Sequence, residues 1–89
     1  MDLKKLSNNL RFKIIKMSHE TRAPHLASSL SCIDIVTTLY ESVLKIKSKN
    51  PKWELRDRFI LSKGHAATSL YVALEYKKFI NEKDLRSYT

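Results

Sequence analysis

Apolar side chains recur every three or four residues from Asp2 to about Glu20. Lysines and asparagines occupy much of the remaining surface, so one face is apolar and the others are polar. That periodicity predicts an amphipathic helix that packs through a single side. The predicted buried stripe consists of Leu3, Leu6, Leu10, Ile14 and Met17.

The helical pattern breaks over residues 21–29, where Pro24 disfavours helical geometry for the residue before it. Ser31 then has the position of an N-cap, and Asp34 completes an approximate capping box. A second helix is therefore expected from there to about Lys47. Its predicted buried positions are Ile35, Val36, Leu39, Tyr40 and either Val43 or Leu44.

The run Phe59-Ile60-Leu61 is continuously apolar. Such a run is typical of a strand buried on both faces of a parallel sheet, although three residues fit a helix as well. The turn Ser62–His65 follows at once, and a second amphipathic stretch continues from there to about Lys78. Its predicted stripe consists of Ala66, Leu70, Ala73 and Leu74.

A strand that leads through a glycine-containing turn into a helix is half of a βαβ unit, so the expected fold class is α/β. Asn81 is expected to cap one last helix from Glu82 to Tyr88. One strand cannot form a sheet by itself. Either the other strands lie outside these 89 residues, or the strand prediction is wrong.

Composition and charge narrow the classes of partner. The 89 residues suit one small domain or a piece of a larger one, and one glycine is few for a complete α/β domain. The net charge of +8 favours anionic partners, which include nucleic acid, membrane surfaces and phosphorylated small molecules. The basic residues are densest from Lys45 to Arg58, and we interpret this stretch as a solvated connection.

Cys32 is the single cysteine, so no intrachain disulfide is possible. It is expected to pack as a small hydrophobe in a reducing, cytoplasmic setting. No apolar run approaches the roughly 18 residues of a membrane span, and the N-terminus lacks the apolar core of a signal peptide. A cytoplasmic protein without a membrane segment is therefore expected.

The turn Ser62–His65 is the most informative local feature. A helix N-terminus presents unpaired backbone N–H groups and the positive end of its dipole, so it suits a phosphate. Gly64 would let the backbone approach such a group, and Lys63 and His65 would add donors. The alternative is a plain strand-to-helix turn whose glycine permits a positive φ.

His25 lies in the break between the first two predicted helices. A histidine there is a candidate acid–base group because imidazole titrates near neutrality, and an exposed or capping histidine is the alternative. His19 is assigned no function. No pattern of cysteines, histidines or carboxylates predicts a metal site, and one glycine cannot build a Gly-rich nucleotide loop.

In chain order, these pieces resemble the start of transketolases, and most of all the split, two-chain or short transketolase-like forms. The similarity covers nearly the whole chain. One matching block is highly specific. The related deoxyxylulose-phosphate synthases usually carry a different sequence around the second histidine, so the turn here favours the transketolase branch. The matching positions are Arg11, Ile14 and Met17, residues 23–36, Leu39-Tyr40, Asn50-Pro51 and the specific block at residues 56–66.

The resemblance implies an enzyme that moves a two-carbon ketol unit between sugar phosphates with thiamine diphosphate and a divalent metal such as Mg²⁺. The histidine matching His25 lies near the reacting carbons and assists proton transfers. The histidine matching His65 lies beside the diphosphate of the cofactor, in the turn that contains Lys63 and Gly64. The resemblance assigns no metal ligand to this chain.

The chain departs from the family in having Pro24, Ala27 and Ser28 where glycines are usual, which adds side-chain bulk. The family's metal-binding Gly-Asp-Gly segment and its pyrimidine-binding domain are not in these residues. We therefore expect residues 1–89 to be part of a thiamine diphosphate-binding domain that is inactive, and binds no cofactor, alone. The remainder of a transketolase or a C-terminal subunit would complete it, in a homo- or hetero-oligomer.

Two other functions stay open. A non-catalytic helical interaction module derived from a transketolase would explain apolar stripes that one strand cannot cover. A nucleic-acid binder is suggested only by the charge of +8, since Trp53 is the only aromatic residue in the basic stretch and no recognition motif is visible.

Overall fold

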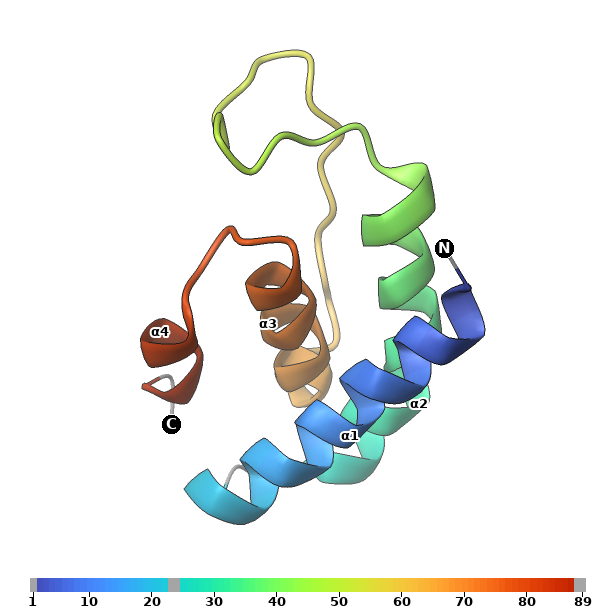
Figure 1. Cartoon of the computed structure of the whole chain (residues 1–89), viewed down its shortest axis with the longest axis vertical. Helices are drawn as coiled ribbons and strands as arrows, with labels where there is room; N and C mark the ends of the chain where they lie inside the picture. Colours follow the sequence, from blue (N-terminus) through green and yellow to red (C-terminus); the bar gives the residue numbers. More distant parts are fainter. Residues whose placement is uncertain (1, 23–24, 88–89) are drawn as a thin grey trace.

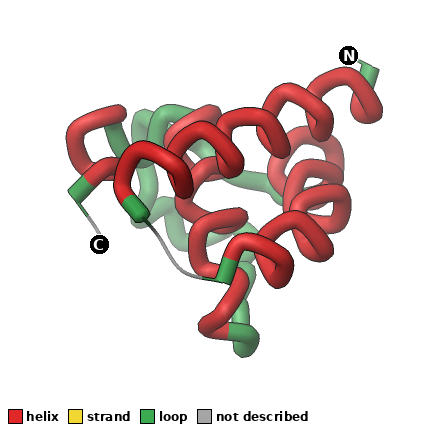
Figure 2. Tube along the Cα trace, turned by 90° about the horizontal axis from the view of Figure 1, so that it is seen from below, coloured by secondary structure: helices red, strands yellow, loops and turns green. Residues whose placement is uncertain are grey.

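The computed structural model describes residues 2–22 and 25–87, and the regular structure in these residues is helical (Figures 1 and 2). α1 packs across α2, α3 contacts both, and α4 lies on the other side of α3 near the C-terminus (Figure 1). None of the described helices combines the length and apolarity needed to cross a membrane. The elements are α1 (Leu3–Thr21), α2 (Leu26–Thr38), the π-helical segment η1 (Leu39–Val43), the 3-10 turn η2 (Gly64–Ala66), α3 (Ala67–Tyr76) and α4 (Glu82–Arg86).

The first predicted helix is confirmed as α1. The Asp2 carboxylate accepts hydrogen bonds from the backbone N–H groups of Lys4 and Lys5, at 3.0 and 3.2 Å, and so caps the helix. Arg22 ends it in the left-handed conformation, with φ of 57°. The predicted stripe is half-buried at Leu3 and buried at Leu6, Leu10, Ile14 and Met17.

The predicted start of the second helix is wrong, because α2 already begins at Leu26. Ser31 lies inside α2, where its hydroxyl donates to the Ser28 carbonyl at 2.9 Å. A serine has this local partner in mid-helix as well as at a cap, so the pattern alone does not separate the two. Asp34 accepts hydrogen bonds from Ser7 and Arg11 of α1, a long-range contact that a local motif does not encode.

The burial predicted for this second helix is only partly confirmed. Val36 is buried, but Ile35 is 64% exposed and Val43 is 56% exposed. Because Ile33 and Val36 face the core, Ile35 lies on the opposite side of α2. The Leu44 N–H donates to the Leu39 carbonyl at 2.8 Å, a five-residue step that widens the last turn and shifts the face of the positions after it. Leu39, Tyr40 and Leu44 are half-buried.

All four α-helices contribute to one hydrophobic core. Val72 of α3 and Leu85 of α4 are fully buried in it. Ala66 and Ala73 of the stripe predicted for α3 are buried, whereas Leu70 and Leu74 are half-buried, because Val72 and two small polar residues form much of the inner face. The core residues are Leu6, Leu10, Ile14, Met17, Ile33, Val72 and Leu85.

The segment predicted as a strand is extended but has no neighbouring strand among the described residues. Just before this segment, the Asp57 N–H donates to the Lys45 carbonyl at 2.8 Å. Phe59 packs edge-on against Tyr40 with ring centroids 6.0 Å apart, whereas Ile60 is 85% exposed. A strand buried on both faces is therefore not present here, and the α/β fold class stays a prediction for a longer chain.

The predicted cap of the last helix is confirmed. The Asp84 N–H donates to the Asn81 side chain at 2.7 Å, and the Asp84 carboxylate accepts from the Asn81 N–H at 3.4 Å. α4 ends at Arg86, and Tyr88, the predicted end, lies outside the described residues. Two ion pairs join α4 to α1: Lys13 with Glu82 and Arg86 with Glu20, each at 2.7 Å.

Candidate functional site

The structure brings together the two histidines that the sequence singled out. The rings of His25 and His65 meet edge-on, with centroids 4.2 Å apart and planes at 66°. His25 precedes α2, and His65 lies in η2 at the start of α3, so the packing of α2 against this end of α3 creates the contact. Both side chains are exposed, so a ligand can reach either ring.

His25 occupies a strained backbone position at the N-cap of α2. Its φ of 64° and ψ of 39° are left-handed, a region that residues with a Cβ seldom adopt. An N-cap normally stabilises its helix through a side-chain oxygen, but the His25 side chain makes no capping hydrogen bond. His25 therefore does not cap α2 through its side chain, whereas the other form of the alternative, an exposed histidine, agrees with its exposed side chain. Strain at an exposed histidine suits a functional position.

Gly64 opens the turn that leads into α3, without a left-handed backbone. The alternative of a glycine needed for a positive φ is therefore wrong. A Cβ built on Gly64 would meet no atom within 4 Å. Neither backbone geometry nor packing within the described residues requires glycine here. The open space leaves room for a ligand against the main chain.

Lys63 precedes this turn, and its carbonyl accepts a hydrogen bond from the Ala66 N–H at 2.9 Å. Its side chain is exposed and does not cap the turn. The N–H groups at the start of the turn are thus not capped by the residue before it. Lys63, Gly64 and His65 together expose a backbone turn with a cation and an imidazole beside it, which suits an anionic group.

Ser29 was not singled out from the sequence, and it lies one helical turn after His25. Its side chain is completely buried, and its hydroxyl has no hydrogen-bond partner among the described residues. Buried hydroxyls are normally paired, so this one lacks a group that it could bind. The i to i+4 spacing from His25 was the available signal, because it places both residues on one side of α2.

The positions where the family usually has glycine are accommodated in different ways. Ala27 is exposed and Ser28 half-buried, both in the first turn of α2. Pro24 lies outside the described residues. The added side chains at residues 27 and 28 are therefore compatible with the helix, and they lie next to His25.

A diphosphate fits the residues present, because the open backbone at Gly64 and the donors of Lys63 and His65 are its usual partners. A metal ion is not provided for in the same way. Among residues 2–22 and 25–87 there is no group of three or more His, Cys, Asp or Glu side chains that could hold one.

Comparison with known proteins gives one consistent family. The profile described as transketolase, thiamine diphosphate binding domain, matches residues 3–89. The chain is 36% identical over 77 residues to one of the subunits of the apulose-4-phosphate transketolase of Phocaeicola vulgatus, a match that covers 86% of this chain and 27% of that protein. It is 37% identical over 82 residues to the transketolase of Aquifex aeolicus, covering 91% of this chain and 12% of that protein.

A third relative is the 6-deoxy-6-sulfo-D-fructose transketolase subunit SqwG of a Clostridium species. The identity is 35% over 79 residues, covering 89% of this chain and 29% of the relative. The chain therefore spans less than a third of the length of each of these three relatives.

Proposed function

Because the chain belongs to the transketolase family, we propose that it supplies the diphosphate side of a thiamine diphosphate site in a ketol-transferring enzyme. The observation that carries this proposal is the 4.2 Å contact between His25 and His65 beside an open glycine turn. An exposed histidine, His25, suits proton transfer, and the uncapped start of α3 suits the binding of an anion. Here the two lie at one site. When bound, thiamine diphosphate supplies the carbanion chemistry of the reaction.

We assign the anchoring role to the start of α3. The backbone at Gly64 would accept the close approach of a diphosphate, and His65 and Lys63 would donate to its oxygens. These groups act by position and charge, and none of them changes covalently. The 3-10 turn fixes them because the Ala66 N–H is held by the Lys63 carbonyl.

We assign proton transfer to His25. Its ring touches that of His65, so it would lie next to any ligand held at the turn. Ketol transfer makes and breaks hydroxyl and carbonyl groups on sugar phosphates, and an imidazole can give and take the protons concerned at neutral pH. The His25 side chain makes no capping hydrogen bond, so capping does not occupy a ring nitrogen.

The remaining parts of the site would come from further sequence or from a partner chain. This chain covers 27% and 29% of two relatives that are named as transketolase subunits. Those names agree with a two-chain enzyme, in which a partner chain brings the pyrimidine side and further sequence brings the metal ligands. We propose that these residues alone are inactive.

A non-catalytic interaction module is the second candidate, favoured by one observation. Four large apolar side chains are more than half exposed on α2, η1 and the connection to α3: Ile35, Val43, Leu55 and Ile60. Exposed apolar surface of this kind invites another protein surface. Both proposed functions need a partner chain or further sequence, so a measurement of ketol transfer is what distinguishes the enzyme from the interaction module.

A chimera tests the proposed function. Residues 1–89 would replace the matched segment of the Aquifex aeolicus transketolase, and ketol transfer between sugar phosphates would be measured with His25→Ala, His65→Ala and His19→Ala. We expect the first two to lower turnover at least about 100-fold, because each removes a group that acts on a ligand. His19 is an exposed histidine at the end of α1, so His19→Ala controls for loss of an imidazole.

The proposal predicts that His65→Ala also raises the cofactor concentration needed for half-maximal activity, whereas His25→Ala lowers turnover at saturating cofactor. If the chimera is active and all three variants behave alike, the assigned roles are wrong. If the chimera folds but shows no transfer of a ketol unit between sugar phosphates, the result favours the non-catalytic interaction module.

A further inference from the structure

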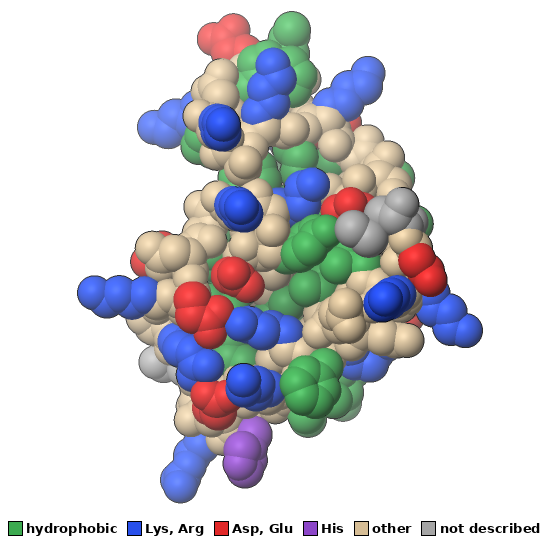
Figure 3. Space-filling model, viewed as in Figure 1, with side chains coloured by type: hydrophobic (Ala, Val, Ile, Leu, Met, Phe, Trp, Pro, Cys, Tyr) green, Lys and Arg blue, Asp and Glu red, His purple; other side chains and the backbone are tan. Residues whose placement is uncertain are grey.

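A groove lies between the connection that follows η1 and the C-terminal end of α3. Two adjoining cavities, of about 360 and 350 Å³, share Ser48 and Lys77 and together form it. The space-filling view is hollowed here, between the upper lobe and the body of the molecule, with lysine side chains beside the hollow (Figure 3). The other lining residues are Ile46, Lys47, Lys49 and Phe79 in one cavity and Tyr76 and Lys78 in the other.

This groove is separate from the histidine site. The histidines lie at the N-terminal end of α3, and the groove lies at its C-terminal end. Ten helical residues separate the two ends by about 15 Å. No lining residue of the groove belongs to the candidate cofactor site, so the groove needs an explanation of its own.

The groove carries unneutralised positive charge. Lys77 lies 3.6 Å from the half-buried Glu41 carboxylate, and the ammonium of Lys47 lies over the ring of Trp53 at 4.2 Å. Lys49 and Lys78 are exposed and have no ion pair with any described residue. Two of the four lining lysines are therefore available to a ligand.

Lys78 holds a position where the fold alone favours glycine. Its φ is 66°, and it follows the last turn of α3 in a Schellman arrangement. The Phe79 N–H donates to the Leu74 carbonyl at 2.9 Å, and the Lys78 N–H donates to the Glu75 carbonyl at 3.0 Å. Lysine is less favourable than glycine in this left-handed position, which makes its side chain a candidate for a role beyond ending the helix.

The wall of the groove is apolar beneath its basic rim. Ile46, Tyr76 and Phe79 are half-buried, and Lys49 and Lys78 stand at the edge. Burial, and then the nearby charge of Glu41, raises the pKa of Tyr76, so its phenol stays neutral. An apolar surface with cations around it is complementary to a peptide whose acidic residues flank an apolar one.

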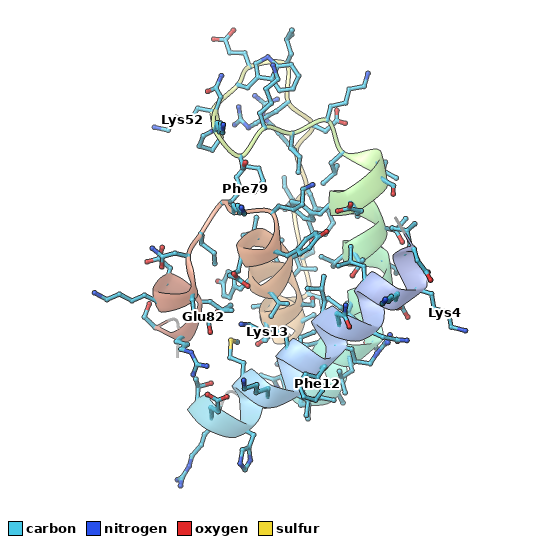
Figure 4. All side chains as sticks on the ribbon, in the orientation of Figure 1. Lys4, Phe12, Lys13, Lys52, Phe79 and Glu82 are labelled. Carbon is cyan, nitrogen blue, oxygen red and sulfur yellow. The ribbon has the colours of Figure 1, made fainter. Side chains whose placement is uncertain are left out.

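We propose that this groove docks a short acidic segment of another protein chain. Carboxylates of the segment pair with Lys49 and Lys78, and an apolar side chain packs on Ile46 and Phe79. Figure 4 labels Phe79 on the connection between α3 and α4, and Lys52 on the lysine-rich connection that borders the groove. The lysine-rich stretch, whose composition alone indicated only a solvated connection, thus provides one wall of a binding surface.

A nucleic acid fits the surroundings less well than a peptide. Glu75, Glu82 and Asp84 line the next cavity, which also includes Lys78 and Phe79, so a long polyanion would be repelled there. The Trp53 ring already carries Lys47 on one face, which leaves it a poor platform for stacking a base. Basic and acidic side chains are also interspersed over the visible face (Figure 3).

The test measures fluorescence anisotropy of a labelled eight-residue peptide of glutamates with one central phenylalanine, added to the full chain in about 150 mM salt. The variant Lys49→Glu/Lys78→Glu should weaken binding at least tenfold. The control Lys4→Glu/Lys5→Glu makes the same change in net charge on exposed positions of α1, away from the groove, and should weaken binding less than twofold (Figure 4).

Lys78→Gly keeps the proposal testable if charge reversal disturbs the fold. Glycine suits the left-handed position, so this variant should remain folded, with a thermal midpoint no lower than that of the unaltered chain, while peptide binding falls at least threefold. Equal weakening by both charge-reversal pairs would overturn the proposal, because it would show attraction to the whole molecule. Tighter binding of a single-stranded oligonucleotide of equal charge, lost in the same groove variants, would overturn it in favour of nucleic acid.

Discussion

Three residues other than glycine adopt left-handed backbone conformations among the described residues: Arg22, His25 and Lys78. Arg22 ends α1, where such a conformation is common. His25 and Lys78 each lie at a surface for which we propose a ligand. Lys78 also follows a helix end, so among these three residues it is His25, before α2, whose left-handed backbone is not explained by a helix C-terminus.

Replacement of His25 tests this strain. His25→Gly should have a free energy of unfolding about 1 kcal/mol higher than His25→Ala, because glycine adopts a φ of 64° without the steric cost that a Cβ brings. Both variants lose the ring contact with His65, so the comparison isolates the backbone. Urea unfolding followed by circular dichroism measures the difference. Equal stability of the two variants would show that the position is not strained.

Asp34 gives a pH dependence with a defined sign. A hydrogen bond from the Ser7 hydroxyl, and then one from Arg11 together with its charge, hold the pKa of Asp34 below its usual range. Its contribution is therefore complete above the unfolded pKa of about 3.9, and it is lost as the pH falls through the lower folded pKa. Since the Asp34 side chain is 68% exposed, the contribution should be at most about 1 kcal/mol.

Asp34→Asn should flatten the loss of stability between about pH 4 and pH 2, measured as the urea midpoint at each pH. Glu54→Gln is the matched control, because Glu54 is exposed and makes no ion pair with a described residue. An unchanged acid slope in Asp34→Asn would contradict the assignment.

At the scale of elements, α4 is too short to be stable by itself. Its five residues fall below the length at which an isolated helix persists, so its order depends on its capping box, on two ion pairs with α1 and on Leu85. Leu85 is fully buried in the shared core. The order of α4 thus depends on contacts with residues outside the helix.

Leu85→Ala should lower the free energy of unfolding by about 2–5 kcal/mol, because it removes buried surface and leaves a cavity. In a chain of this size, such a loss is a large part of the total stability. Thermal unfolding by circular dichroism measures it. Lys83→Ala, an exposed change on the same helix, should leave the midpoint almost unchanged, and a similar midpoint for both variants would show that α4 is not docked.

The sequence predicted the elements whose signals are local. The stripe of α1 and the Asn81 cap of α4 are confirmed, since spacing and capping chemistry act within a few residues. The predicted start of the second helix was wrong because a serine such as Ser31 can find a local hydrogen-bond partner both at a cap and in mid-helix. The sequence also selected His25 and His65, but their contact depends on the packing of α2 against α3, which no local pattern contains.

We expect residues 59–61 to form a strand only where neighbouring strands are present to pair with them. Ile60 is 85% exposed and the segment around it has no neighbouring strand among the described residues, although its sequence suits a buried position. Residues 59–61 should therefore exchange their amide hydrogens rapidly in this chain and slowly in the chimera with the Aquifex aeolicus transketolase. Hydrogen exchange with mass spectrometry measures both. Rapid exchange in an active chimera would show that the α/β prediction is wrong for this segment.

Calorimetric titration of thiamine diphosphate with Mg²⁺ into this chain alone, into the chimera and into the chimera with His65→Ala tests whether the start of α3 anchors the cofactor. We predict no binding to the chain alone, binding to the chimera, and binding at least about tenfold weaker after His65→Ala, equivalent to about 1.4 kcal/mol. Binding to the chain alone, together with turnover of sugar phosphates, would contradict the proposed function. So would a His65→Ala chimera that binds the cofactor with unchanged affinity.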